Sequence, residues 1–210
     1  MKNESGRSMV EMLGVLAIIG VLSAGALAGY SKAMYKIKMN KMIEQLSKIA
    51  VNVQIMASND TSHTITDEWL YDHRLTAGFI PEEMIQGDKI LTPFQNELYL
   101  LHGWGDATRL EMGFFNGHGI AITSPQMCAD LSAVNWGNLD TAAMGIFSDS
   151  EYIESWIGDD YSEGYFDEDV YIATKYGTQL RFPVSASVYA PVCKKCTEQN
   201  PCNFQLIFEL

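Results

Sequence analysis

Cysteines are the residues of this 210-residue chain whose type and spacing point most directly to chemistry. There are four, and three of them crowd the C-terminal region: Cys128, Cys193, Cys196 and Cys202. An even number of cysteines behind an export-type N-terminus is typical of two structural disulfides formed in an oxidising compartment. The CKKC spacing also fits half of a zinc site or a redox pair, and the sequence alone leaves both alternatives open.

The connectivity of four cysteines has three solutions. We expect Cys128 to pair with Cys193 or Cys196 across a loop of more than sixty residues, and the other two C-terminal cysteines to pair with each other. A redox pair is the least favoured alternative, because a redox CxxC is expected at a strand-to-helix junction near a βαβ pattern.

A dense acidic segment is the second group with chemical potential. Nine carboxylates lie between residues 149 and 169, and Asp159, Asp160, Asp167 and Asp169 are the weak candidates for calcium ligands, since calcium prefers oxygen donors. Their spacing does not fit an EF-hand loop, and aromatic residues alternate with the acids. The pattern therefore favours a solvated acidic surface over a metal site.

Catalytic motifs are absent from the sequence. His63, His73, His102 and His118 stand in unrelated contexts, and there is no nucleophile elbow, P-loop or HExxH spacing. We therefore expect a protein that is not an enzyme and needs no cofactor.

Charge is shared unevenly along the chain. Residues 1–50 hold seven Lys or Arg against three Glu, whereas residues 51–210 hold seven against twenty-three Asp or Glu. An acidic body argues against nonspecific nucleic-acid binding, which needs clustered cations to neutralise phosphates. The length fits one soluble domain once the apolar N-terminal run is set aside.

That N-terminal run is long enough for a membrane. Residues 12–31 are twenty uncharged residues, which as a helix span about 30 Å, the hydrocarbon thickness of a bilayer. An amphipathic stripe follows without a proline, at Met39, Ile43, Leu46, Ala50, Val53 and Met56. The two patterns together predict one helix of about fifty residues.

Three interpretations of this segment predict different proteins. A simple anchor would keep its N-terminus cytoplasmic through Lys2 and Arg7. An ordinary secretory signal would end at Ala26 and Ala28, before Gly29, and would release a secreted binding protein. The continuing amphipathic stripe argues against such a release.

A third interpretation comes from residues 6–11, GRSMVE, which resemble the cleavage site of type IV pilins and of the pseudopilins of type II secretion. The resemblance implies that a prepilin peptidase removes Met1 to Gly6 and that Arg7 becomes the methylated N-terminus. It also implies that Glu11, fifth in the mature chain, pairs with the α-amino group of a neighbouring subunit during assembly. An unpaired carboxylate at membrane depth is costly, which gives such a partner a physical purpose.

Two features depart from the family pattern. Arg7 replaces the usual apolar or aromatic first residue, and the proline that often kinks these helices is missing. Gly20, Gly25 and Gly29 either loosen the helix, at about 1 kcal/mol each relative to alanine, or form a small-residue face for close packing.

The rest of the chain reads as a sheet domain. Residues 59–95 predict a variable loop with a short helical stretch at 68–78, and residues 97–103, 109–117 and 118–124 predict an antiparallel meander. Ser124 and Pro125 are typical of a helix start, and residues 204–209 alternate as a final strand. The helix-borne cysteine and the size of the body resemble the type IVb pilins.

We therefore expect an α+β, pilin-like fold in which a long N-terminal helix, membrane-like then amphipathic, packs on an antiparallel sheet. The expected parts are a leader at 1–6, the helix at 7–58 and a disulfide-bonded globular domain at 59–210. The resemblance implies a bacterial filament subunit, first single-pass in the inner membrane, then in an extracellular or periplasmic filament. Its partners would be further copies or other pilins, the prepilin peptidase and an inner-membrane assembly platform. The alternative function within the same family is a type II secretion pseudopilin.

Overall fold

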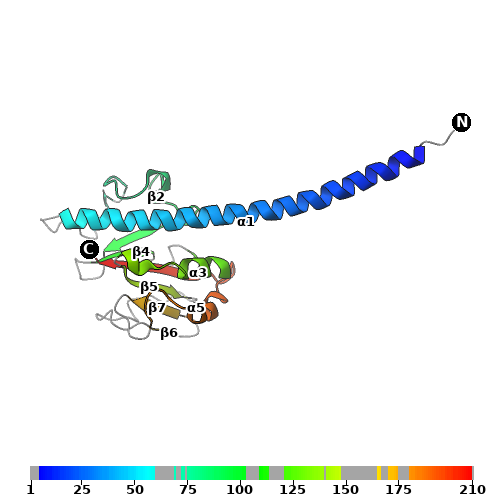
Figure 1. Cartoon of the computed structure of the whole chain (residues 1–210). Helices are drawn as coiled ribbons and strands as arrows, with labels where there is room; N and C mark the ends of the chain where they lie inside the picture. Colours follow the sequence, from blue (N-terminus) through cyan, green and yellow to red (C-terminus); the bar gives the residue numbers. More distant parts are fainter. Residues whose placement is uncertain are drawn as a thin grey trace. The chain divides into compact units, whose positions relative to one another are not determined.

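The computed structural model describes residues 5–59, 69, 72–73, 75–102, 109–113, 121–139, 141–147, 165–166, 170–174 and 180–209. The fold is α+β, with one long N-terminal helix and an antiparallel sheet (Figure 1). Two compact units make up the chain, Met1–Asn40 and Lys41–Leu210, and we call them the stem unit and the sheet unit. The expected α+β, pilin-like architecture is therefore confirmed.

Helix α1 (Ser5–Asn59) is continuous over 55 residues, as predicted from the two joined patterns. Its sequence is rich in Ala, Leu, Met and Lys, which are good helix formers, and the first proline of the chain is Pro81. Five glycines inside α1, at 6, 14, 20, 25 and 29, do not interrupt it. The helix also passes unbroken through Ala28 and Gly29, where the secretory interpretation places a cleavage site.

Part of α1 belongs to the sheet unit, and there its apolar stripe is buried. The stripe comprises Met42, Leu46, Ile49, Ala50 and Val53, all fully buried. The predicted stripe is confirmed at Met39, Leu46, Ala50 and Val53, whereas Ile43 and Met56 are only half-buried and Met42 and Ile49 are buried in their place. Burying each of the larger side chains contributes about 2 kcal/mol, so this face anchors α1 to the core of the sheet unit.

Side-chain amides supply directional contacts beside that apolar face. Asn52 Nδ2 donates to the carbonyl oxygen of Phe79 at 3.1 Å, and Gln54 Nε2 donates to the carbonyl oxygen of Leu139 at 2.9 Å. These bonds satisfy backbone groups of two segments distant in sequence. They fix how those segments meet the helix.

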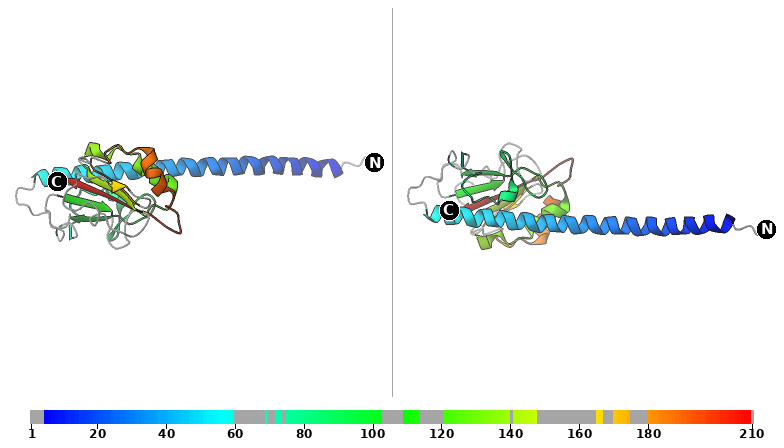
Figure 2. Two further views of the ribbon diagram at one scale, coloured as in Figure 1. Left: turned by 90° about the horizontal axis from the view of Figure 1, so that it is seen from below. Right: turned by 90° about the horizontal axis from the view of Figure 1, so that it is seen from above.

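The main sheet has six strands in the order β3-β4-β8-β5-β7-β6, and every described pairing is antiparallel. The strands are β3 (Tyr99–His102), β4 (Arg109–Gly113), β5 (Thr141–Phe147), β6 (Tyr165–Phe166), β7 (Val170–Thr174) and β8 (Asn203–Glu209). Strand β8, red in Figure 2, lies between β4 and β5. The last described strand therefore occupies the centre of the sheet.

Strand β8 confirms the final strand predicted at residues 204–209, with one difference. The alternating pattern predicts one buried face, formed by Phe204, Leu206 and Phe208, and these are indeed fully buried. Ile207 and Gln205, on the opposite face, are buried as well. A central strand is covered on both faces, which the local alternation does not reveal.

The predicted meander is only partly correct. Strands β3 and β4 pair as expected, for example Leu100 with Met112. The third run, residues 118–124, does not follow as a neighbouring strand: in its described part only Ile122 pairs, in an isolated bridge with Cys202. Strand β8 takes the place beside β4 instead, a long-range pairing that local sequence does not encode.

Helix α3 (Pro125–Ser132) begins where the sequence predicts. The Ser124 hydroxyl accepts a hydrogen bond from the backbone N–H of Met127 at 3.2 Å, and Pro125 occupies the first turn. Helix α5 (Ala186–Cys193) and the short 3₁₀ helix η2 (Trp136–Leu139) were not predicted. Pro191 inside α5 is a reason to expect no helix there.

The predicted loop at 59–95 contains a small hairpin, so that prediction was wrong in its second half. A 3₁₀ turn, η1 (Glu82–Met84), leads into β1 (Ile85–Gln86) and β2 (Lys89–Ile90), which pair antiparallel. Gly87 has φ of 66° in the two-residue turn, a conformation that favours glycine. Of the expected helical stretch at 68–78, the structure describes residues 69, 72–73 and 75–78: residues 69, 72 and 73 are helical, and residues 75–78 form a turn and a bend.

Candidate functional site

The first candidate surface is the stem unit, whose apolar side chains are exposed on every side of the helix. From Met9 to Leu27 the large apolar residues are between 53% and 75% exposed. A helix that is hydrophobic all round belongs in a membrane or in a core supplied by other chains. The stem unit therefore needs an apolar environment that its own chain does not provide.

Length supports the same conclusion. Among the described residues, one helix is long and apolar enough to cross a bilayer, and it fits a single-pass membrane anchor. The glycines at 14, 20, 25 and 29 of this helix have open space around them, because an added Cβ would meet nothing within 4 Å. Close packing at these glycines therefore requires another molecule.

The processing and assembly candidates lie together at the start of α1. The helix begins at Ser5, so Gly6 and Arg7 are in its first turn, and Glu11 is exposed about one turn beyond. Arg7 and Glu11 are four residues apart and share a helix face, with their Cα atoms separated by a rise of about 6 Å. The only carboxylate of the apolar run thus lies beside the position that would become the mature N-terminus.

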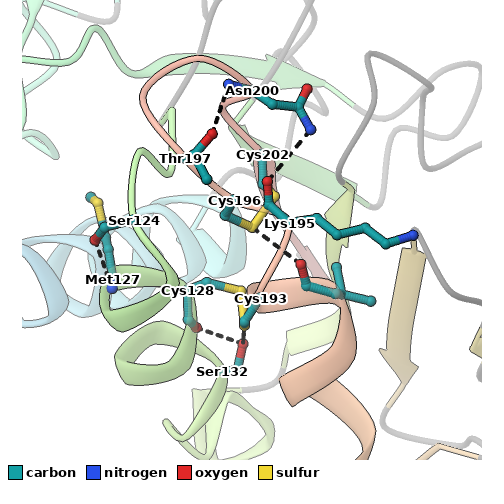
Figure 3. The surroundings of a disulfide bond; sticks show 11 residues. Ser124, Met127, Cys128, Ser132, Cys193, Lys195, Cys196, Thr197, Asn200 and Cys202 are labelled. Carbon is teal, nitrogen blue, oxygen red and sulfur yellow. Dashed lines mark hydrogen bonds between the residues drawn. A yellow bond between two sulfur atoms is a disulfide. The ribbon is translucent and has the colours of Figure 1, made fainter.

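The second candidate is the disulfide cluster, drawn in Figure 3. Cys128 of α3 is bonded to Cys193 of α5 with a Cα–Cα distance of 5.3 Å, and Cys196 is bonded to Cys202 at 5.0 Å. Two disulfides were predicted and both are present, with Cys193 as the partner of Cys128. No cysteine is free, so the thiolates that the zinc and redox alternatives require are absent.

Both disulfides connect elements of the sheet unit. The first ties two helices of the sheet unit together, and the second closes a small loop immediately before β8. In that loop Thr197 and Asn200 exchange hydrogen bonds, from the Thr197 N–H to the Asn200 carbonyl at 2.9 Å and from the Asn200 N–H to the Thr197 hydroxyl at 3.0 Å. The second disulfide and these hydrogen bonds therefore fix the conformation of the segment that leads into β8.

A calcium site receives no support in the described part of the chain. The candidates Asp159, Asp160, Asp167 and Asp169 lie outside the described residues. Among the described residues, no three His, Cys, Asp or Glu side chains are grouped to hold a metal ion.

The histidines remain in separate places. His73 is exposed, stacks on Trp69 with a centroid distance of 4.8 Å, and lies 2.9 Å from the Trp69 carbonyl oxygen through Nδ1. His102 ends β3, whereas His63 and His118 lie outside the described residues.

Charged residues of the hairpin region form a third feature, which sequence reasoning missed. Gln45 Nε2 donates to Glu83 Oε1 at 3.2 Å, and Lys41 Nζ lies 4.0 Å from the same oxygen. A hydrogen bond from its own backbone N–H, then the bond from Gln45, lowers the pKa of Glu83. The signal in the sequence was the acidic pair EE followed by the turn GD, read only as loop.

Two other lysines also have carboxylate partners. Lys48 Nζ is 2.6 Å from Glu44 Oε1, and this hydrogen bond raises the pKa of Lys48. Lys89 Nζ is 2.9 Å from Glu97 Oε2, and that bond raises the pKa of Lys89. Each pair has at least one side chain that is about half exposed to solvent, so each contributes little to stability.

The sequence matches no family model and no curated protein. Assignment to a family therefore depends on the N-terminal resemblance and on the physical character of α1.

Proposed function

We propose that this chain is a structural subunit of a type IV pilus or pilus-like filament. The observation that carries the proposal is the continuous helix α1, whose apolar first part is exposed on all sides yet has the carboxylate of Glu11 near its start. In the proposal this part is held in the inner membrane of a bacterium before assembly. It then enters a shared bundle of helices from further copies or other pilins.

Processing creates the assembly contact. A prepilin peptidase would remove residues 1–6, leaving the α-amino group at Arg7 with or without a methyl group. In a staggered bundle this amino group would meet the Glu11 carboxylate of an adjacent subunit. An unpaired acidic residue costs about 3 kcal/mol near the bilayer centre on insertion scales, so its retention near an apolar helix end favours a waiting partner.

The continuity of α1 also weighs against a secreted binding protein. Release after Ala28 would cut the helix in its middle and discard its apolar part. The remaining half would keep its buried stripe in the sheet unit. Such a protein gives Glu11 no role.

The proposal is tested by replacing Glu11 with leucine, alanine and glutamine and comparing sheared filament yield with the membrane pool. We expect a normal membrane pool for each variant, because the changes leave the span at least as apolar. Filaments should be lost in Glu11→Leu and Glu11→Ala and reduced less in Glu11→Gln, which retains a hydrogen-bond acceptor. Ser23→Leu is the matched control, since it adds an apolar side chain to the same helix without removing a charge.

Normal filaments from Glu11→Leu would eliminate the pairing mechanism, and loss of the membrane pool would assign the residue to insertion. Intact mass provides the second readout. The proposal expects a mature chain that starts at Arg7 and an unprocessed precursor when Gly6 is replaced by a bulky residue. A chain that starts at Gly29 contradicts it.

A further inference from the structure

A group of lysines follows directly after the apolar run of α1 and has no neutralising acid on its own helix. Lys32, Lys36, Lys38 and Lys41 lie within ten residues, and the chain has no Asp or Glu between Glu11 and Glu44. Lys32 and Lys36 are four residues apart and share one helix face, where like charges repel. The nearest acid in sequence, Glu44, is about 12 Å of helix rise beyond Lys36.

The last lysine of this group, Lys41, and two lysines further along the chain have acidic partners. Lys41, Lys48 and Lys89 each have a carboxylate within 4.0 Å. Lys32 and Lys36 are exposed, and neither forms an ion pair with any residue that the structure describes. Lys32 and Lys36, four residues apart on one helix face, are therefore two exposed cations without an ion-pair partner among the described residues.

Membrane orientation does not explain these lysines. The proposed function places the disulfide-bonded sheet unit in an oxidising compartment, so Lys32 and Lys36 would flank the outer side of the span. Lys and Arg normally concentrate on the cytoplasmic flank. Cations on the opposite flank call for another source of stabilisation, such as a carboxylate surface.

The chain itself has such a surface. The hairpin region at residues 82–97 has four carboxylates, Glu82, Glu83, Asp88 and Glu97, against the single cation Lys89. Glu83 is held by Gln45, and Glu97 by Lys89, whereas Glu82 and Asp88 are exposed. The bond from Gln45 attaches this acidic surface to the sheet-unit part of α1, so its carboxylates have a defined position.

We propose that Lys32 and Lys36 of one copy dock against Glu82 and Asp88 of a second copy of this chain. The inference rests on the proposed function, and it adds an electrostatic contact outside the apolar bundle. Exposed pairs of this kind are individually weak in water and are screened by salt. Their effect is on register and partner choice more than on affinity, and the contact would repeat with every subunit along a filament.

Charge reversal with compensation tests the contact in the full-length protein. Lys32→Glu with Lys36→Glu should reduce sheared filament yield by about tenfold with an unchanged membrane pool, because like charges then face each other. Glu82→Lys with Asp88→Lys should have a similar effect. Combining all four changes should restore the yield to within about threefold of wild type, because the attraction is re-formed with opposite sign.

Arg181→Glu with Lys194→Glu is the matched control, since it makes the same change in net charge at two exposed residues of the sheet unit. The control should leave the yield unchanged. A fourfold variant as defective as the lysine pair would overturn the proposal. Loss of the membrane pool in the lysine variant would also overturn it, since it would indicate contact with anionic lipid headgroups.

A second measurement separates this inference from the proposed function. Full-length protein labelled with ¹⁴N and ¹⁵N is mixed in detergent micelles and treated with a carbodiimide, which joins a lysine amine to a nearby carboxylate. Mixed-isotope peptides linking residue 32 or 36 to residue 82 or 88 are expected at low salt and should decrease at high salt. Filaments without these cross-links would refute the contact and leave the filament role intact. Cross-links without filaments would support the contact and refute the filament role.

Discussion

The stem unit and the sheet unit use the same apolar residue types in opposite environments. Leu16 of the stem unit is 61% exposed, whereas Leu46 on the same helix is fully buried in the sheet unit. The helical propensity of leucine is equal at both positions, so the difference comes from what surrounds the helix. The part of α1 in the sheet unit is stabilised by the core of that unit, whereas the exposed apolar part in the stem unit has no such core.

The comparison teaches that one helix can have two separate sources of stability. In the sheet unit, loss of a buried contact should reduce the free energy of unfolding. In the stem unit, the same chemical change should affect insertion or assembly and leave the sheet unit unaltered. The three predictions below test this separation.

The largest expected effect concerns the long-range disulfide. Replacing Cys128 and Cys193 with alanine should reduce the free energy of unfolding of the sheet unit by about 4 kcal/mol, because the bond restricts a long loop in the unfolded chain. The same change at Cys196 and Cys202 should cost about 2 kcal/mol, since six residues separate them rather than 65. Urea unfolding followed by tryptophan fluorescence measures both, with buried Trp136 as a reporter.

Equal losses in the free energy of unfolding for the two pairs would contradict the chain-entropy explanation. They would show that local packing around the bonds determines their contribution to stability. Membrane insertion should be unchanged in both variants, because neither bond involves the stem unit.

A leucine pair on α1 tests the separation directly. Leu46→Ala should reduce the free energy of unfolding by about 3 kcal/mol, since it leaves a cavity in the sheet-unit core. Leu16→Ala, the matched control on the same helix, should leave the urea midpoint of the sheet unit unchanged because the side chain is exposed. A midpoint shift for Leu16→Ala similar to that of Leu46→Ala would mean that the two units unfold together.

The smallest expected effect is the pH dependence due to Glu83. Its pKa is lowered in the folded state from 4.5, so its stabilising contribution is fully present above pH 4.5 and is lost as the pH falls through the lower folded value. Glu83→Gln should cost about 0.5 kcal/mol or less at pH 7, because the group is exposed and screened, and less at pH 3, where protonation has begun to remove the contribution. Thermal melting at both pH values measures this difference.

The matched control is Glu82→Gln, which removes the same charge from the neighbouring residue without touching the Gln45 contact. A loss of stability that persists at pH 3 in Glu83→Gln would assign the effect to packing instead of charge.

Features with local chemistry were predictable from the sequence. The long helix followed from continuous helix formers without a proline, the start of α3 from the Ser124 and Pro125 signal, and the disulfides from an even number of cysteines. The processing and assembly candidates also came from sequence alone, and they remain predictions.

Features that depend on distant segments were not predictable. Strand β8 separates β4 from β5 and is buried on both faces, and nothing in its own alternation indicates either property. Strands β5 and β7 and helix α5 were not predicted, and Pro191 inside α5 is an unfavourable signal for a helix. The hairpin at Gly87 had a recognisable turn, but strands of two residues are too short to give a periodic signal.

The central place of β8 has a consequence for the order in which the sheet forms. Strands β4 and β5 do not pair with each other, and residues 203–209 pair with both. The sheet therefore cannot close until that late segment is present, and in the proposed topology it crosses the membrane well after the strands that it joins. Cys193, Cys196 and Cys202 emerge just before β8, so oxidation of the thiols and closure of the sheet should coincide, and chains stopped before residue 203 should stay open to proteolysis.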